Sequence, residues 1–195
     1  MARDVSGSIA LVSIAKTYYV DCYGCTASEL AMTEIERAKR LLKYDAWADL
    51  ETIRSLASVV ATNSDQTQQE PRKPIPRLIA HIIGAKWNWL ARTRGERPPM
   101  AIWPDIAPQD LDRAMADVQV AWRTYLDSQS DDDLSRVVTY ANSKGEEYRN
   151  TVSDIVMQVV VHSEHHRGQI AQTVRALGGQ PALTDYIQYA RTVGA

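Results

Sequence analysis

Hydrophobic residues recur every three to four positions in four long segments of the chain, the spacing that places them on one face of an α-helix. The segments cover about residues 34–61, 75–94, 109–128 and 151–177. The third has the most regular repeat, formed by Leu111, Ala114, Met115, Val118, Ala121, Trp122 and Tyr125. Four long amphipathic helices joined by connectors of differing length predict an all-α protein, a four-helix bundle.

Local signals support the ends of two of these helices. Pro76 suits the first turn of the second helix, and Gly95 suits the position just past its last residue. Thr151, followed three positions later by Asp154, matches the pattern in which a hydroxyl and an acidic side chain cap a helix start reciprocally. The fourth helix is therefore expected to begin near Thr151 and to end before Gly178.

Shorter elements are expected between and after the long helices. The acidic run at 131–133 should end the third helix. Residues 137–148 alternate in polarity around a polar, Gly-containing turn, which is typical of a short hairpin before the last long helix. A short final helix is predicted at about 184–189, packed across the bundle.

The first 31 residues do not share the helical pattern of the rest. Thr33, directly after Met32, and Glu36 three positions later form a capping pair that marks a helix start. A natural chain could itself begin at Met32. We therefore expect residues 1–31 to be an N-terminal extension, weakly ordered or a start-site artefact. Residues 32–195 form the predicted bundle domain.

Composition excludes several classes of partner. The net charge of −2 provides no electrostatic basis for binding nucleic acid, and no run approaches the roughly 20 apolar residues of a membrane span. The two cysteines, Cys22 and Cys25, lack the second pair or the βαβ context of a zinc or redox site. Such sparse cysteine usage suits a reducing compartment, so a cytoplasmic location is expected.

Two histidines stand four residues apart on the predicted fourth helix. His162 and His166 continue the apolar face begun by Ile155 and Val159, so both should point into the bundle. A single histidine in this position is usually a hydrogen-bonded core residue. Two together are harder to satisfy there, because an unpaired buried polar group costs about 1–3 kcal/mol.

His81 lies on the apolar face of the second helix and completes a set of three. Three neutral imidazoles that leave a fourth position open are the ligands of a catalytic divalent ion. The fourth histidine, His165, falls off the apolar face and is expected to meet solvent or an interface. The residue pattern therefore predicts a metal site at His81, His162 and His166.

Other known site patterns do not fit the chain. A zincin requires His-Glu-x-x-His, whereas Glu164 is two residues after His162 and lies on another face. A ferritin-like di-iron site needs inward glutamates, and the second helix has no acidic residue before Glu96. Neither a phosphate-binding loop nor a Gly-x-Ser-x-Gly nucleophile turn occurs.

Four segments together resemble the DinB/YfiT-like superfamily. They are the His-x-x-x-His-Arg-Gly-Gln run of 162–169, Tyr44-Asp-Ala-Trp-Ala-Asp49, the His81 to Trp87 segment and the tail Thr184-Asp-Tyr-Ile187. The resemblance extends over about residues 32–191. It implies an up-down-down-up four-helix bundle, often a homodimer, with His81, His162 and His166 as ligands of zinc or nickel. Characterised members of this superfamily include thiol-dependent S-transferases and an isomerase that uses a low-molecular-weight thiol.

The chain departs from the family pattern at Asp45 and Asp49, where asparagine is common. An acid near a ligand imidazole can accept its second N–H and fix its tautomer. The simpler alternative, which we favour, is that these residues lie on the helix surface. Arg167 follows a predicted ligand directly, and two roles stay open for it: binding an anionic substrate group, or pairing with a carboxylate of the fold.

The function expected from this pattern is a metal-dependent transferase that activates a thiol for attack on a small-molecule electrophile. Trp89, Trp103 and Tyr148 are the candidates for the apolar wall of its substrate pocket. A metal-dependent hydrolase is the first alternative, although it needs an acid or base near the ion. The second alternative is a non-enzymatic, stress-related binding protein. The sequence identifies neither the metal nor the substrates.

Overall fold

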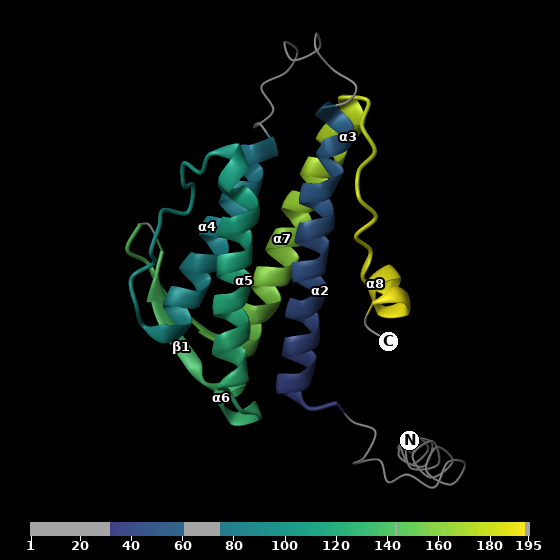
Figure 1. Ribbon diagram of the computed structural model, residues 1–195. Helices are drawn as coiled ribbons and strands as arrows, with labels where there is room; N and C mark the ends of the chain where they lie inside the picture. The colour runs from purple at the N-terminus through teal and green to yellow at the C-terminus, as the bar shows by residue number, and fades with distance from the viewer. Residues whose placement is uncertain (1–31, 61–74, 143, 194–195) are drawn as a thin grey trace, which may run out of the picture. The chain divides into compact units, whose positions relative to one another are not determined.

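In the computed structural model, the described residues are 32–60, 75–142 and 144–193. The expectations for residues 1–31, the two cysteines among them, and for the helix end at 61 lie outside these ranges. Four long helices form a bundle: α2 (Glu34–Ser55), α4 (Ile75–Arg94), α5 (Leu111–Asp127) and α7 (Val152–Ala176) (Figure 1). The predicted all-α four-helix bundle is confirmed.

The helices are arranged so that α2 and α4 each pack mainly against α5 and α7. Figure 1 shows α2 and α7 running upward and α4 and α5 running downward, the up-down-down-up order. After α4, residues 95–107 return along the side of the bundle before α5 begins. This connection matters for the site, because it lies over the outer face of α4.

Six shorter elements lie among the described residues of the bundle: α3 (Ala57–Val60), the 3-10 turn η1 (Pro108–Asp110), α6 (Asp131–Ser135), β1 (Val137–Ala141), β2 (Glu147–Thr151) and α8 (Tyr186–Thr192). The first predicted helix is interrupted by a turn at Leu56. The acidic run forms a helix of its own, because the Ser130 side chain caps the Asp133 amide and Asp133 caps Ser130 in return. The final helix begins two residues later than predicted.

The predicted hairpin and the predicted cap of the last long helix are both present. Strands β1 and β2 pair antiparallel, with Tyr140 opposite Tyr148 and Gly145 at φ 81° in the turn. Strand β2 leads directly into α7, where Thr151 and Asp154 form the reciprocal capping box. This cap sets the residue at which α7 starts and therefore which of its residues face α4.

The middle of α4 is enclosed on every side. Each residue from Leu78 to Lys86 is buried, although a helix on the outside of a bundle normally exposes one face. The 95–107 connection supplies the missing cover, and Gly84 permits the close approach. A Cβ there would meet the Ala101 and Ile102 carbonyl oxygens at 2.5 and 2.7 Å.

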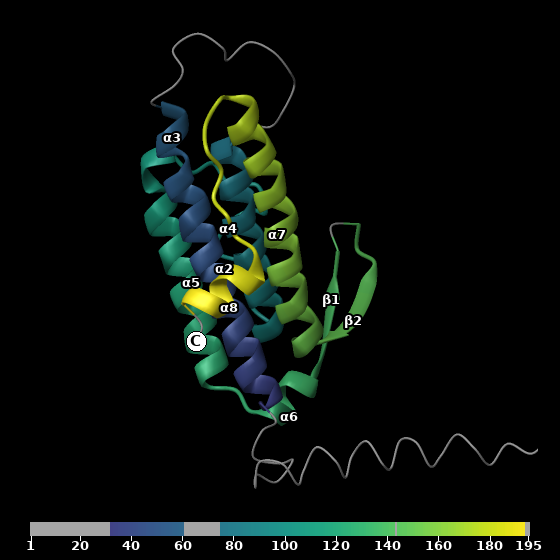
Figure 2. The ribbon, with the colours of Figure 1, turned by 90° about the vertical axis from the view of Figure 1, so that its right-hand side faces the viewer.

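The C-terminal segment returns along α2 and ends in α8, which lies across α2 (Figure 2). Tyr44 anchors it, donating its hydroxyl hydrogen to the Thr184 carbonyl at 2.8 Å and packing edge-on against Tyr186 and Tyr189. Among the described helices, none is both long and apolar enough to cross a membrane.

Candidate metal centre

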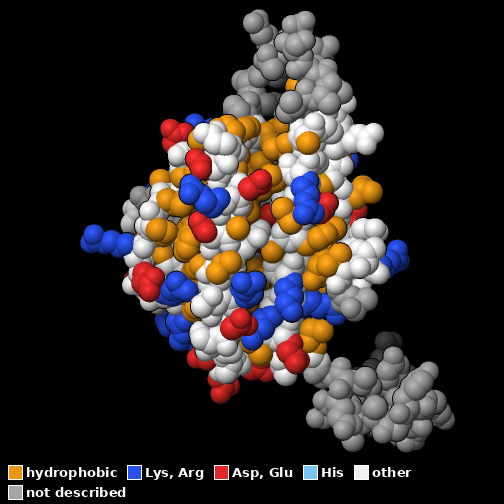
Figure 3. All heavy atoms as spheres, viewed as in Figure 1, with side chains coloured by type: hydrophobic (Ala, Val, Ile, Leu, Met, Phe, Trp, Pro, Cys, Tyr) orange, Lys and Arg blue, Asp and Glu red, His pale blue; other side chains and the backbone are white. Residues whose placement is uncertain are grey.

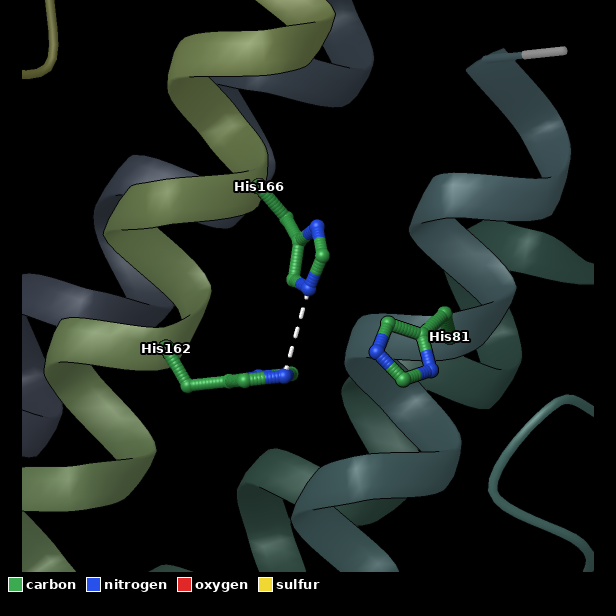
Figure 4. A group of neighbouring side chains, drawn as sticks. All are labelled: His81, His162 and His166. Atoms are coloured by element: carbon green, nitrogen blue, oxygen red, sulfur yellow. Dashed lines mark hydrogen bonds between the residues drawn. The ribbon is translucent and has the colours of Figure 1, made fainter. Parts of the chain in front are cut away.

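The three predicted histidines meet between α4 and α7 (Figure 4). One ligand nitrogen from each of His81, His162 and His166 lies within 4.8 Å of the others. The Nε2 atoms of His162 and His166 are 3.2 Å apart, and the His81 ring centroid lies 5.1 and 4.7 Å from theirs. The spacing of four on α7 and the packing of α4 beside it bring the set together.

His81 is oriented by the 95–107 connection. Its Nδ1 lies 3.0 Å from the Ile102 carbonyl oxygen, and because a carbonyl only accepts, Nδ1 must carry the hydrogen. The lone pair is then on Nε2, which faces the other two rings (Figure 4). The Trp103 indole stacks on the His81 ring at 3.7 Å between centroids. Backbone carbonyls commonly fix the tautomer of metal-ligating histidines in this way.

His166 is oriented by Gln169, which was not among the predicted site residues. Its Nδ1 lies 2.8 Å from Gln169 Oε1, and the amide nitrogen of Gln169 lies 3.0 Å from Nε2 of His165. The amide oxygen accepts from Nδ1, which leaves the Nε2 lone pair of His166 toward the centre. The signal was the i,i+3 spacing of an amide after a ligand. His165 itself is exposed, as predicted.

The electrostatics of the cluster favour neutral rings. Burial, together with the nearby His166 and His81, lowers the pKa of His162 from 6.5 to about 4. At neutral pH its imidazole is therefore uncharged and able to donate a lone pair. Three neutral imidazole nitrogens, two of them with their outer nitrogens anchored, match the donor set of a divalent ion with an open position. The residues present thus fit such an ion.

Beside the histidines lies a buried ion-pair quartet, formed by Asp45 and Asp49 of α2, Lys86 of α4 and Arg167 of α7. Arg167 Nη1 is 2.7 Å from Asp45 Oδ1 and 2.8 Å from Asp49 Oδ1. Lys86 Nζ is 2.5 Å from Asp45 Oδ2 and also contacts Asp49 Oδ2. None of the four residues is more than 3% exposed. Each carboxylate therefore bridges both cations.

The quartet corrects the predicted positions of Asp45 and Asp49. The favoured surface location is wrong, since both are buried, and their oxygens accept from Lys86 and Arg167. Of the two roles left open for Arg167, the structure shows pairing within the fold, to which Glu164 adds a third carboxylate. The Arg167 guanidinium is buried.

The two cations of the quartet stay charged. Burial alone would lower the pKa of Lys86, but its attraction to Asp45 and Asp49 outweighs that cost and leaves the pKa raised. The pKa of Arg167 is raised for the same reason. With two acids and two bases, the quartet is neutral in sum, which is the condition for burying four charges.

The predicted aromatic wall is split between two places. Trp103 is at the histidine cluster, with the Arg77 guanidinium 5.6 Å from its ring. Trp89 comes eight residues after His81, about 12 Å farther along the helix axis, and packs edge-on against Tyr140 of the hairpin. Tyr148 is 45% exposed and stacks on the same Tyr140. The ring contacts of Trp89 and Tyr148 are thus with the hairpin.

A substitution of Gly84 should loosen the site without touching a ligand. In Gly84→Ala the new Cβ would collide with the Ile102 carbonyl, so the connection must shift and His81 loses its acceptor. Loss of such a partner should weaken divalent-metal affinity roughly 10–100-fold, measured by chelator competition. Gly168→Ala on α7 is the control, since a Cβ there meets nothing within 4 Å. Equal affinities in the two variants would contradict the role of the connection.

Removing one cation of the quartet should destabilise the whole bundle. Lys86→Met leaves two buried carboxylates with Arg167 alone, and an uncompensated buried charge costs about 3–5 kcal/mol, to be measured by urea unfolding. Lys39→Met breaks the exposed pair with Asp127, 3.1 Å apart, and should cost at most about 1 kcal/mol. Similar losses of unfolding free energy in both variants would show that the quartet stabilises the bundle no more than an exposed ion pair does.

Comparison with known proteins agrees with this fold. The chain is 23% identical over 159 residues to Protein DinB of Bacillus subtilis (strain 168), a match that covers 78% of this chain and 92% of that protein. Its fold is similar to the crystal structure of a DinB-like protein from Bacillus cereus ATCC 10987, with a TM-score of 0.53 and 17% identity over 72% of this chain and 91% of that one. The family model of the DinB superfamily matches residues 44–170, which include all three clustered histidines. The chain belongs to the DinB superfamily.

Proposed function

We propose that this protein binds one divalent metal ion, zinc or nickel, through His81, His162 and His166 and uses it to activate a thiol. The thiol loses its proton, and its sulfur bonds to an electrophilic carbon while a leaving group departs from that carbon with the electron pair of the broken bond. The observation that carries the proposal is the convergence of three ring nitrogens within 4.8 Å of one another. Two of the rings have their outer nitrogens held by the Ile102 carbonyl and the Gln169 amide. Such second contacts are expected of ligands rather than of incidental core histidines.

A divalent ion at this position supplies a Lewis acid that lowers the pKa of a thiol or water reaching its open side. The protein's own residues hold and shield the site. His81 is only 7% exposed, and Trp103, 36% exposed, covers one face of its ring. The Arg77 guanidinium beside Trp103 provides a positive charge for an anionic group of the co-substrate.

The side chains around the site favour thiol transfer over hydrolysis. Hydrolysis needs a general acid or base near the ion. Asp45 and Asp49 are buried acids on α2. Their oxygens are taken up by Lys86 and Arg167. A thiol requires less assistance because its pKa is already near neutrality.

The remaining parts of the proposal follow from the family resemblance. The co-substrate is a low-molecular-weight thiol and the acceptor is a small electrophile. The protein acts as a homodimer in the cytoplasm, where thiols stay reduced.

Metal content tests the site directly. Protein purified without a metal-affinity tag should contain about one divalent ion per chain by elemental analysis, and His162→Ala should lose it. His165→Ala is the matched control, because His165 is exposed and lies outside the cluster, so this variant should keep its metal. Stoichiometric metal in His162→Ala would refute the three-histidine site.

Activity tests the chemistry. The metal-loaded protein should consume thiol and electrophile together, lose that activity in a chelator and regain it when zinc or nickel is restored. Esters and amides should not be cleaved. Hydrolysis without thiol turnover would favour the hydrolase, and metal binding with neither activity would favour the binding protein.

A further inference from the structure

A cavity opens between α2 and α5, the pair of helices opposite α4 and α7 in the bundle. It has a volume of about 410 Å³, within the range of small-molecule sites. Figure 3 shows the face on which α2 and α5 lie, with hydrophobic side chains along it and Lys and Arg side chains gathered toward its lower half. We call this cavity the α2–α5 cleft. It takes no part in the metal chemistry proposed above.

The inner end of the cleft carries a buried hydrogen-bond donor. Lys86 lines the cleft and is 3% exposed. Its ammonium group has three N–H bonds, and contacts with Asp45 and Asp49 account for two. Within the described part of the chain, the third has no hydrogen-bond partner. Asp45 also lines the cleft, but its two oxygens already accept from Lys86 and Arg167. A ligand there therefore meets one donor.

The walls of the cleft are apolar and firm. Trp122 forms one side, is 2% exposed and is fixed by donating its indole hydrogen to the Lys86 carbonyl at 3.1 Å. Leu126 and Val159 are fully buried and line the cleft as well. A flat or slender apolar body therefore has a preformed surface to bury against.

The outer rim is positively charged. Lys39, Lys43 and Arg123 line it against a single acid, Asp127, which is paired with Lys39. Lys43 and Arg123 are exposed, and neither has an ion-pair partner among the residues that the structure describes. The rim thus favours binding of an anionic group. The inner end does not, because the quartet there is neutral in sum.

We propose that the α2–α5 cleft binds a small amphipathic carboxylate that has a hydroxyl or carbonyl group at its far end. The carboxylate lies at Lys43 and Arg123, the apolar body packs on Trp122, and the distal oxygen accepts from Lys86. This order of groups follows from the cleft itself, which has cations at its outer rim, apolar side chains along its walls and a neutral, hydrogen-bonding group at its inner end.

Three matched ligands test the order of groups by calorimetry and by the shift of the Trp122 indole N–H signal. We expect para-hydroxyphenylpropionate to bind best. Phenylpropionate lacks the distal hydroxyl and para-hydroxyphenylpropionamide lacks the charge, so each should bind roughly five- to tenfold more weakly. Metal-free and metal-loaded protein should behave alike. No binding, or equal binding of all three ligands, would overturn the proposal.

Variants on the exposed rim locate the site without disturbing the core. Lys43→Glu should weaken binding roughly five- to tenfold, whereas Arg149→Glu, the same charge change on the hairpin, should alter it by less than about twofold. Ala116→Trp should fill the cleft and abolish binding, with thermal unfolding as the check on folding. Binding that survives Ala116→Trp would refute the site. So would a dimer that this substitution dissociates, because the cleft would then be occupied by a second copy of the chain.

Discussion

The structure depends on one interaction, the sharing of two buried aspartates by two buried cations. Asp45 and Asp49 come from α2, and each bridges Lys86 of α4 and Arg167 of α7. Four charges can be removed from water only if all are present, since any one left unpaired costs several kcal/mol. The quartet therefore joins three helices and fixes how each one is rotated about its own axis. Because Arg167 follows His166, fixing the guanidinium also fixes the direction in which His166 points.

Two further constraints complete the centre, and both act on the outer nitrogen of a histidine. The Ile102 carbonyl holds His81, and Gly84 allows the connection that carries this carbonyl to approach α4. The Gln169 amide holds His166 from within α7 itself. Ring positions are thus set by a buried charge network, a covering loop and a local amide, each independent of any ion. A site prepared in this way loses little conformational entropy when it binds a cation.

The features that could be predicted from sequence are those specified by neighbouring residues. Periodicity located the long helices, Thr151 and Asp154 located the start of α7, and a spacing of four placed His162 beside His166. What failed depended on distant partners. Asp45 looked like a surface residue because acids normally are exposed, and the arginine that buries it is 122 positions away. The one sequence signal for the quartet was a lysine within the otherwise apolar middle of α4. The contact of Trp89 with Tyr140 could not be predicted for a related reason, since the hairpin lies far along the chain.

The quartet also limits the chemistry that a metal at this centre can support. Water has a pKa of about 15.7, and lowering it to neutrality usually leaves catalysis in need of a carboxylate to move protons. A free thiol has a pKa of about 8.5. A cation held by the three histidines would need to lower that pKa only slightly to give a thiolate at neutral pH. Asp45 and Asp49 are committed to Lys86 and Arg167. Because the buried aspartates of this bundle are paired with cations, the centre is better suited to a thiol, a nucleophile that does not require a carboxylate base.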